Sequence, residues 1–137
     1  MYINSSATPQ SGTNVTTWQS DNSSSQRWWI QPVNVGERQY YVRPTETSPL
    51  GLNIARDQGN NCNLYATIGN PAADSVVTII DEHATKGSNI FGLVLLQHML
   101  AMTKTGTPYY VGGQHGYEVN WQAPVDSNGQ YWEITIA

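Results

Sequence analysis

The sequence predicts an all-β fold with pseudo-threefold symmetry, made of three repeats of roughly fifty residues. In each repeat an apolar residue is followed thirteen positions later by a second bulky apolar residue and, two positions further, by isoleucine. The three sets are Val15, Trp28 and Ile30; Leu64, Val77 and Ile79; and Val119, Trp132 and Ile134. Glycine and proline interrupt the chain about every ten residues, which is typical of short strands joined by turns.

Composition supports the same fold class. Only 12% of the 137 residues are charged. Asn, Ser, Thr, Gln and Gly are abundant, and few of these favour a long helix. We expect a single domain over residues 1–137, with repeats at about 1–35, 36–85 and 86–137, because the repeats leave no room for a second domain.

The expected strands are short apolar or aromatic segments between turn signals. In the first repeat they are residues 2–4, 14–18 and 28–33, in the second 39–43, 52–54, 63–67 and 75–80, and in the third 91–98, 109–111, 118–122 and 131–136. Residues 98–104 fit either a continued strand or a short helical turn. The loop at 19–25 and the turn at 126–129 are rich in Ser, Asn, Asp and Gly, as connections between paired strands are.

The repeats are not equal in strand number. The second and third repeats each have a strand upstream of the shared pattern, at 39–43 and 91–98, whereas the first has none. Either residues have been lost before Met1 or a neighbouring chain covers the gap. An open strand edge can pair with another chain, so this asymmetry favours a homo-oligomer.

Charge and hydropathy exclude several partners. The net charge is −4 with only six Lys and Arg, so we expect no nucleic-acid binding. The longest apolar stretch, 90–102, is interrupted by polar residues and is too short to span a bilayer, so we expect no membrane insertion. No secretory signal is visible, although a processed chain would look the same, and we expect a cytoplasmic location or leaderless secretion.

Catalysis and metal binding have little support. Cys62 is the single cysteine, so it can form neither an internal disulfide nor a cysteine metal cluster. The three histidines lack a short metal-ligand spacing, and no two carboxylates are singled out as a glycosidase pair. Asp81, Glu82 and His83 are sequential and are best interpreted as a solvated loop. We therefore expect no enzyme activity, no metal and no cofactor.

Two repeats share a Gln-x-Trp motif, as Gln26-Arg27-Trp28 and Gln130-Tyr131-Trp132, each followed by x-Ile. With three repeats of about fifty residues, the chain resembles the β-trefoil of the ricin B-type lectins, including the small disulfide-free forms of fungi and bacteria. The second repeat departs from the motif, because Ser75-Val76-Val77 replaces it. The resemblance implies glycan or glycoconjugate partners, with galactose or N-acetylgalactosamine slightly favoured.

The resemblance also implies a sugar pocket in the first repeat. Asn4 takes the family's first polar position, Trp18 the aromatic platform, and Ser25 with Gln26 the position beside the motif, with Asn22 close by. The family more often has a carboxylate where this chain has Asn4 and an asparagine where it has Ser25. These differences affect the choice of ligand.

The other two repeats match this pattern less well. Asn53 keeps the first position in the second repeat, but Thr67 stands at the platform. In the third repeat the first position falls on Pro108 or Gly112, neither of which offers a side-chain hydrogen bond. We expect a second pocket there to be built differently, from His115, Tyr117, Asn120, Trp121 and Gln130.

Sugar binding also follows from residue chemistry. A pyranose ring has an apolar face and a rim of hydroxyls, so it requires an aromatic ring and neutral amides or hydroxyls. The chain has five Trp and eight Tyr but one Phe. Trp28 and Trp132 are expected in the core, whereas Trp18 fits either a pocket or the core.

A carbohydrate-binding lectin is therefore the first hypothesis. The alternative is a β-trefoil protease inhibitor that inserts an exposed loop, at 56–63 or 106–116, into a protease cleft. A toxin's receptor-binding subunit would still be a lectin in physical terms.

Overall fold

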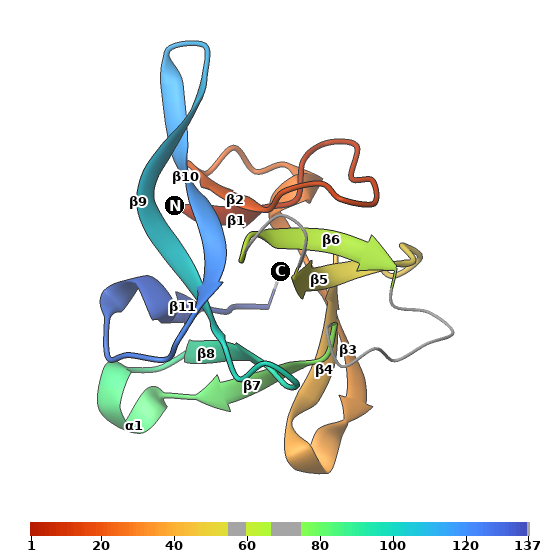
Figure 1. Cartoon of the computed structure of the whole chain (residues 1–137), viewed down its shortest axis with the longest axis vertical. Helices are drawn as coiled ribbons and strands as arrows, with labels where there is room; N and C mark the ends of the chain where they lie inside the picture. Colours follow the sequence, from red (N-terminus) through yellow and green to blue (C-terminus); the bar gives the residue numbers. More distant parts are fainter. Residues whose placement is uncertain (55–59, 67–74, 137) are drawn as a thin grey trace.

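The computed structural model describes residues 1–54, 60–66 and 75–136. These residues form a β-trefoil of eleven strands, which confirms the predicted fold class (Figure 1). The described part contains no helix that is long and apolar enough to cross a membrane. Its helical elements are single turns: η1 (Ser24–Gln26), η2 (Val35–Glu37), α1 (His83–Lys86) and η4 (Asn128–Gln130).

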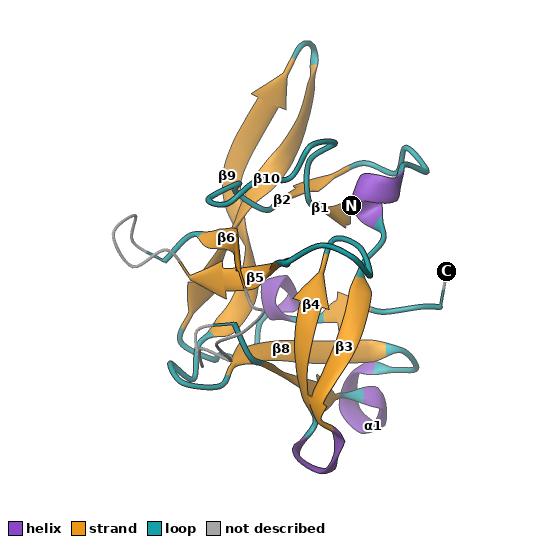
Figure 2. Ribbon diagram, turned by 90° about the vertical axis from the view of Figure 1, so that its right-hand side faces the viewer, coloured by secondary structure: helices purple, strands orange, loops and turns teal. Residues whose placement is uncertain are grey.

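Five strands form the barrel layer of the trefoil. They are antiparallel neighbours in the order β11 (Trp132–Glu133), β8 (Ile90–Leu95), β7 (Val77–Asp81), β4 (Gln39–Arg43) and β3 (Trp29–Asn34). Figure 2 shows β3 and β4 side by side, above the turn formed by η2. Asn34 begins that turn, because its side chain accepts a hydrogen bond from the Glu37 N–H.

Three two-stranded hairpins form the cap. They are β1 (Tyr2–Asn4) with β2 (Thr16–Trp18), β5 (Leu50–Ile54) with β6 (Cys62–Ala66), and β9 (Ala101–Val111) with β10 (Gln114–Gln122). The third hairpin is the longest, and its tip projects from the rest of the molecule (Figure 1). Residues 98–104, left open by the sequence, contain the end of a turn and the start of β9.

The second strands of the three hairpins meet at the symmetry axis. Their contacts form a cycle of three pairs: Asn14 with Asn63, Asn61 with Asn120, and Glu118 with Thr16. This cycle makes Val15, Cys62 and Val119 equivalent, and all three are buried.

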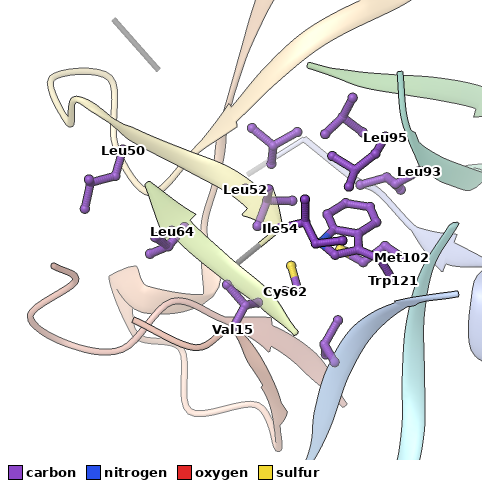
Figure 3. Close-up of a cluster of buried hydrophobic side chains, with 13 residues drawn as sticks. Val15, Leu50, Leu52, Ile54, Cys62, Leu64, Leu93, Leu95, Met102 and Trp121 are labelled. Atoms are coloured by element: carbon purple, nitrogen blue, oxygen red, sulfur yellow. The ribbon is translucent and has the colours of Figure 1, made fainter. Parts of the chain in front are cut away.

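The sequence pattern is therefore wrong by two positions in the second repeat, where Cys62 rather than Leu64 is the starting residue. The chain has two more residues between Cys62 and Val77 than in the matching segments, and one sequence cannot reveal such an insertion. Leu64 is equivalent to Thr17 and Trp121 instead, and it remains fully buried in the same cluster (Figure 3).

The second residues of the three sequence sets, Trp28, Val77 and Trp132, occupy equivalent places, as predicted. Trp28 and Trp132 pack against the core, and Val77 is fully buried. The Trp28 indole N–H donates to the Ile3 carbonyl at 3.2 Å, and the Trp132 indole N–H donates to the Met102 carbonyl at 3.0 Å. The two tryptophans thus join the barrel to the cap in the same way.

Candidate functional site

A hollow of about 330 Å³ lies between the first cap hairpin and the projecting third hairpin. Its walls come from β1, the segment before β2, β2 itself and the end of β9. The lining residues are Asn4, Ser6, Asn14, Thr16, Trp18, Tyr109 and Val111. The structure thus brings together the two central residues of the predicted pocket, Asn4 and Trp18.

Asn4 holds the start of the loop and keeps one polar group available. Its Oδ1 accepts a hydrogen bond from the Ser6 N–H at 2.9 Å, and Ser6 adopts a left-handed backbone with φ of 77°. Within the described residues its Nδ2 has no hydrogen-bond partner. A neutral amide donor is therefore free at the wall of the hollow.

Trp18 forms the aromatic wall together with Tyr109. The two rings lie edge to face, with centroids 6.1 Å apart and planes at 70°, a favourable arrangement for aromatic pairs. Trp18 is half-buried, so part of its ring is available to a ligand.

Gly116 allows the third hairpin to approach this wall. A Cβ atom at Gly116 would lie 1.7 Å from the Thr17 carbonyl oxygen and 2.9 Å from the Trp18 ring. The close approach is fixed by the Tyr117 N–H, which donates to Thr17 Oγ1 at 3.0 Å. Only glycine fits this crossing of β10 over β2.

The other predicted pocket residues, Asn22, Ser25 and Gln26, lie outside the lining of the hollow. Gln26 instead shapes the loop that follows Trp18: its Nε2 donates to the Gln19 carbonyl at 2.8 Å, and its Oε1 accepts from the Asp21 N–H at 3.3 Å. Asn22 occupies a left-handed turn position, with φ of 61°. The Ser25 carbonyl accepts from the Ser5 N–H, which holds η1 against the end of β1.

The predicted second pocket is not assembled. Trp121 is fully buried and donates its indole N–H to the Asn53 carbonyl at 2.9 Å, so it cannot contact a ligand. Gln130 is also buried, where it accepts from the Val125 N–H and donates to Thr103 Oγ1 and the Ala123 carbonyl.

The three remaining residues of that prediction do not form a pocket with them. His115 and Tyr117 pack edge to face on the projecting hairpin, with centroids 5.4 Å apart. Asn120 is engaged by the side chain of Gln122 at 2.8 Å. The prediction of a second site is therefore wrong, because Trp121 and Gln130 are buried.

In the other two repeats, the residues that occupy the positions of Asn4 and Trp18 also differ from those predicted. Strand pairing makes Asn4, Asn53 and Thr103 equivalent, so neither Pro108 nor Gly112 takes the first position in the third repeat. The same pairing places Tyr65, not Thr67, at the platform of the second repeat; Thr67 lies outside the described residues.

Five lining residues were not predicted. Asn14 and Thr16 precede Trp18 at intervals of two, so alternation along a strand places all three on one face, and the sequence contains this signal. Ser6 follows Asn4 at the same interval. Tyr109 and Val111 belong to another repeat, and no local pattern connects them to Trp18.

Two carboxylates outside the hollow are held by local hydrogen bonds. The pKa of Asp81 is lowered, chiefly because its carboxylate accepts from the backbone N–H of His83 at 2.9 Å. The pKa of Asp126 is lowered by hydrogen bonds from Lys86 at 2.8 Å and Tyr131 at 2.7 Å. No group of three or more metal-binding side chains is found where the structure describes the chain.

Cys62 is fully buried at the symmetry axis, and burial raises the pKa of its thiol, which makes it a poor nucleophile. What the hollow offers is a neutral surface: two amides, two hydroxyls, two aromatic rings and a valine. Such a surface binds polar, uncharged molecules that have an apolar face.

No protein-family model and no curated protein matches the chain. Solved structures share its fold at low sequence identity. The designed threefold-symmetric protein ThreeFoil aligns with a TM-score of 0.71 and 14% identity over 96% of this chain and 87% of its own. A Caenorhabditis elegans protein of unknown function aligns with a TM-score of 0.68 and 17% identity, over 97% of this chain and 85% of its own.

A mosquitocidal holotoxin aligns with a TM-score of 0.74 and 15% identity over 96% of this chain, but this chain spans only 15% of the toxin's length. At these identities the likeness concerns the fold alone. The chain is a β-trefoil, similar in structure to a designed threefold-symmetric protein, to part of a mosquitocidal holotoxin and to a protein of unknown function.

Proposed function

We propose that this protein is a lectin that binds glycans in the hollow between the first and third cap hairpins. The observation that carries the proposal is the convergence of Asn4 and Trp18 on one hollow. Asn14 and Thr16 add an amide and a hydroxyl to the same wall.

The chemistry of the hollow matches a sugar ring. The Trp18 and Tyr109 rings supply an apolar wall against which the C–H face of a pyranose can pack. The free Nδ2 of Asn4 can donate to one hydroxyl, and the Asn14 and Thr16 side chains can bond its neighbours. The volume of about 330 Å³ lies at the lower end of small-molecule sites, which suits a terminal sugar.

A shallow site of this size binds weakly, because it buries few ligand atoms. Useful avidity would require several linked sites.

The protease-inhibitor alternative has weaker support. Residues 106–116 form a hydrogen-bonded hairpin rather than a free loop, since Val111, Tyr110 and Tyr109 pair with Gln114, His115 and Gly116. The other candidate loop, 56–63, lies partly outside the described residues, and its described end includes the buried residues Cys62 and Asn63.

The test is a glycan array with the wild-type protein, Trp18→Ala and Trp29→Ala. Trp29 is exposed on β3 and lies outside the hollow, so it is a matched control. We expect selective glycan binding that Trp18→Ala abolishes and Trp29→Ala leaves unchanged. A wild-type protein that binds no glycan but inhibits a member of a protease panel would replace this proposal with the alternative.

A further inference from the structure

One carboxylate lies beside the neutral hollow of the first hairpin. Glu118 on β10 is the strand partner of Thr16, and Thr16 is also the partner of Asn4. The three residues form one row across β10, β2 and β1 (Figure 1), and residues directly opposite each other project from the same face of a sheet. Because Asn4 and Thr16 line the hollow, Glu118 continues their row at its edge.

Alternation along β10 places Glu118 on the same face. Gly116, two residues earlier, faces the Trp18 ring, since a Cβ atom there would lie 2.9 Å from it. The strand partner of Gly116 is Tyr109, which lines the hollow. Residues two apart in a strand share a face, so Glu118 faces the side of the hollow. Its exposure agrees with this, because the next residue, Val119, is the buried one.

An equivalent strand pair shows how close such side chains come. In the cycle at the symmetry axis, Asn14 and Asn63 pair as Glu118 and Thr16 do. The Asn63 Nδ2 donates a hydrogen bond to Asn14 Oδ1, so these two side chains are in direct contact. The same backbone pairing brings the Glu118 side chain beside that of Thr16.

The negative charge is particular to this lobe. The residues equivalent to Glu118, each directly before a buried residue at the axis, are Asn14 and Asn61, which are neutral amides. The Glu118 carbonyl accepts from Thr105 Oγ1 at 2.9 Å, which fixes its backbone. Its carboxylate takes part in no hydrogen bond or ion pair within the described residues, so no cation neutralises it there.

We propose that Glu118 is a specificity-determining residue of the glycan site, and that its carboxylate selects neutral sugars by excluding acidic ones. This inference rests on the proposed lectin function and names the class of glycan that the hollow accepts. The residue comes from the third repeat, although the hollow belongs mainly to the first.

The lining alone does not make this selection. The free Nδ2 of Asn4 can donate to a sugar carboxylate as well as to a hydroxyl. A discriminating site therefore needs an element that disfavours the wrong ligand. A sugar carboxylate bound beside Glu118 would meet a like charge, whereas a sugar hydroxyl can donate a hydrogen bond to it. Two like charges about 6 Å apart near a protein surface repel enough to lower affinity about tenfold.

The test compares a neutral glycan that the wild type binds on the array with the same glycan after oxidation of its terminal CH₂OH to a carboxylate. For a galactose terminus, the pair is galactose and galacturonic acid. We expect the wild type to bind the neutral member at least about tenfold more tightly. In Glu118→Gln, which has nearly the same size but no charge, the two members should bind within about threefold of each other.

Two controls separate this local effect from other causes. Glu133→Gln, at an exposed position on β11, removes the same single charge and should keep the wild-type preference. Raising the salt to about 1 M should weaken the preference of the wild type, because screening acts on charges and not on a steric clash.

Each result has a distinct meaning. Equal binding of the two members by the wild type, a preference for the acidic member, or a preference that persists in Glu118→Gln overturns the role of Glu118 and leaves the lectin proposal standing. The same loss of preference in Glu133→Gln overturns it as well. A wild-type protein that binds no glycan on the array overturns both proposals.

Discussion

The first cap hairpin has the same backbone pairing as the other two, but the three hairpins differ in the surroundings of one polar residue: Asn4, Asn53 or Thr103. In the second and third hairpins the equivalents of Asn4 are buried and bonded internally. Asn53 donates to Ser75 Oγ at 2.6 Å, and Thr103 accepts from Gln130 Nε2 at 3.1 Å. Asn4 has no such partner, because Gln26 is bonded to the loop backbone alone.

This difference shows how three equivalent places on a symmetric backbone come to differ in their side-chain environment. The backbone provides three similar places, and each becomes core or pocket according to whether an internal side chain satisfies its polar residue. A buried polar group without such a partner is costly, so an unsatisfied position remains stable only where solvent or a ligand reaches it.

The largest effect is expected from tryptophan replacements on the two sides of the comparison. Trp121→Ala removes a fully buried side chain and a buried hydrogen bond, so the free energy of unfolding should fall by about 3–5 kcal/mol. Trp18→Ala should lower it by about 1 kcal/mol or less, as expected for a partly exposed side chain. Urea denaturation measures both, and equal losses would contradict the assignment of Trp18 to an open wall.

The two motif glutamines provide the next test. Gln130→Ala removes a buried side chain that bonds the Val125 N–H, the Ala123 carbonyl and the buried Thr103 hydroxyl, which should cost about 2–3 kcal/mol. Gln26→Ala removes two hydrogen bonds at an exposed loop, which should cost about 1 kcal/mol at most. The comparison fails if the two variants unfold at the same denaturant concentration.

Gly116→Ala tests whether the third hairpin completes the pocket of the first. The added methyl would collide with the Thr17 carbonyl, so β10 must move away from β2. We expect a loss of about 1–3 kcal/mol in the free energy of unfolding, together with weaker glycan binding as Tyr109 withdraws from Trp18. Gly113→Ala is a matched control near the hairpin tip, where an added methyl meets no atom within 4 Å. Unchanged glycan binding in Gly116→Ala would remove Tyr109 from the site.

The fold was predictable because burial repeats along the chain. Val15, Val77 and Val119 lie in the core as their spacing predicts, since each repeat must bury an apolar residue at the same level of a shared core. The register of the second repeat was not predictable. Two extra residues before Val77 shift the pattern, and nothing in the apolar spacing distinguishes Cys62 from Leu64 as its start.

The site was predictable only in part. Asn4 and Trp18 lie on neighbouring strands of one hairpin, so local spacing places them together. Trp121 looked available because it adjoins polar residues in the sequence, yet alternation along β10 turns it inward while Asn120 and Gln122 bond each other outside. Tyr109 reaches the pocket through the crossing at Gly116, which is a tertiary contact with no local signature.

The smallest effect on stability is expected where the effect on binding is large. Asn4→Ala removes one hydrogen bond, to the Ser6 N–H, from a partly exposed position, and the free energy of unfolding should change by about 0.5 kcal/mol or less. Asn53→Ala is the matched change in the second cap hairpin. It leaves the buried Ser75 hydroxyl without its partner and should lower the free energy of unfolding by about 1–3 kcal/mol. Titration of both variants with the glycan selected on the array should show loss of binding for Asn4→Ala and wild-type affinity for Asn53→Ala. The reverse result would place the sugar site at the second cap hairpin, where Tyr65 stands at the platform position. It would also show that internal hydrogen bonding of the residue equivalent to Asn4 does not decide which hairpin binds the sugar.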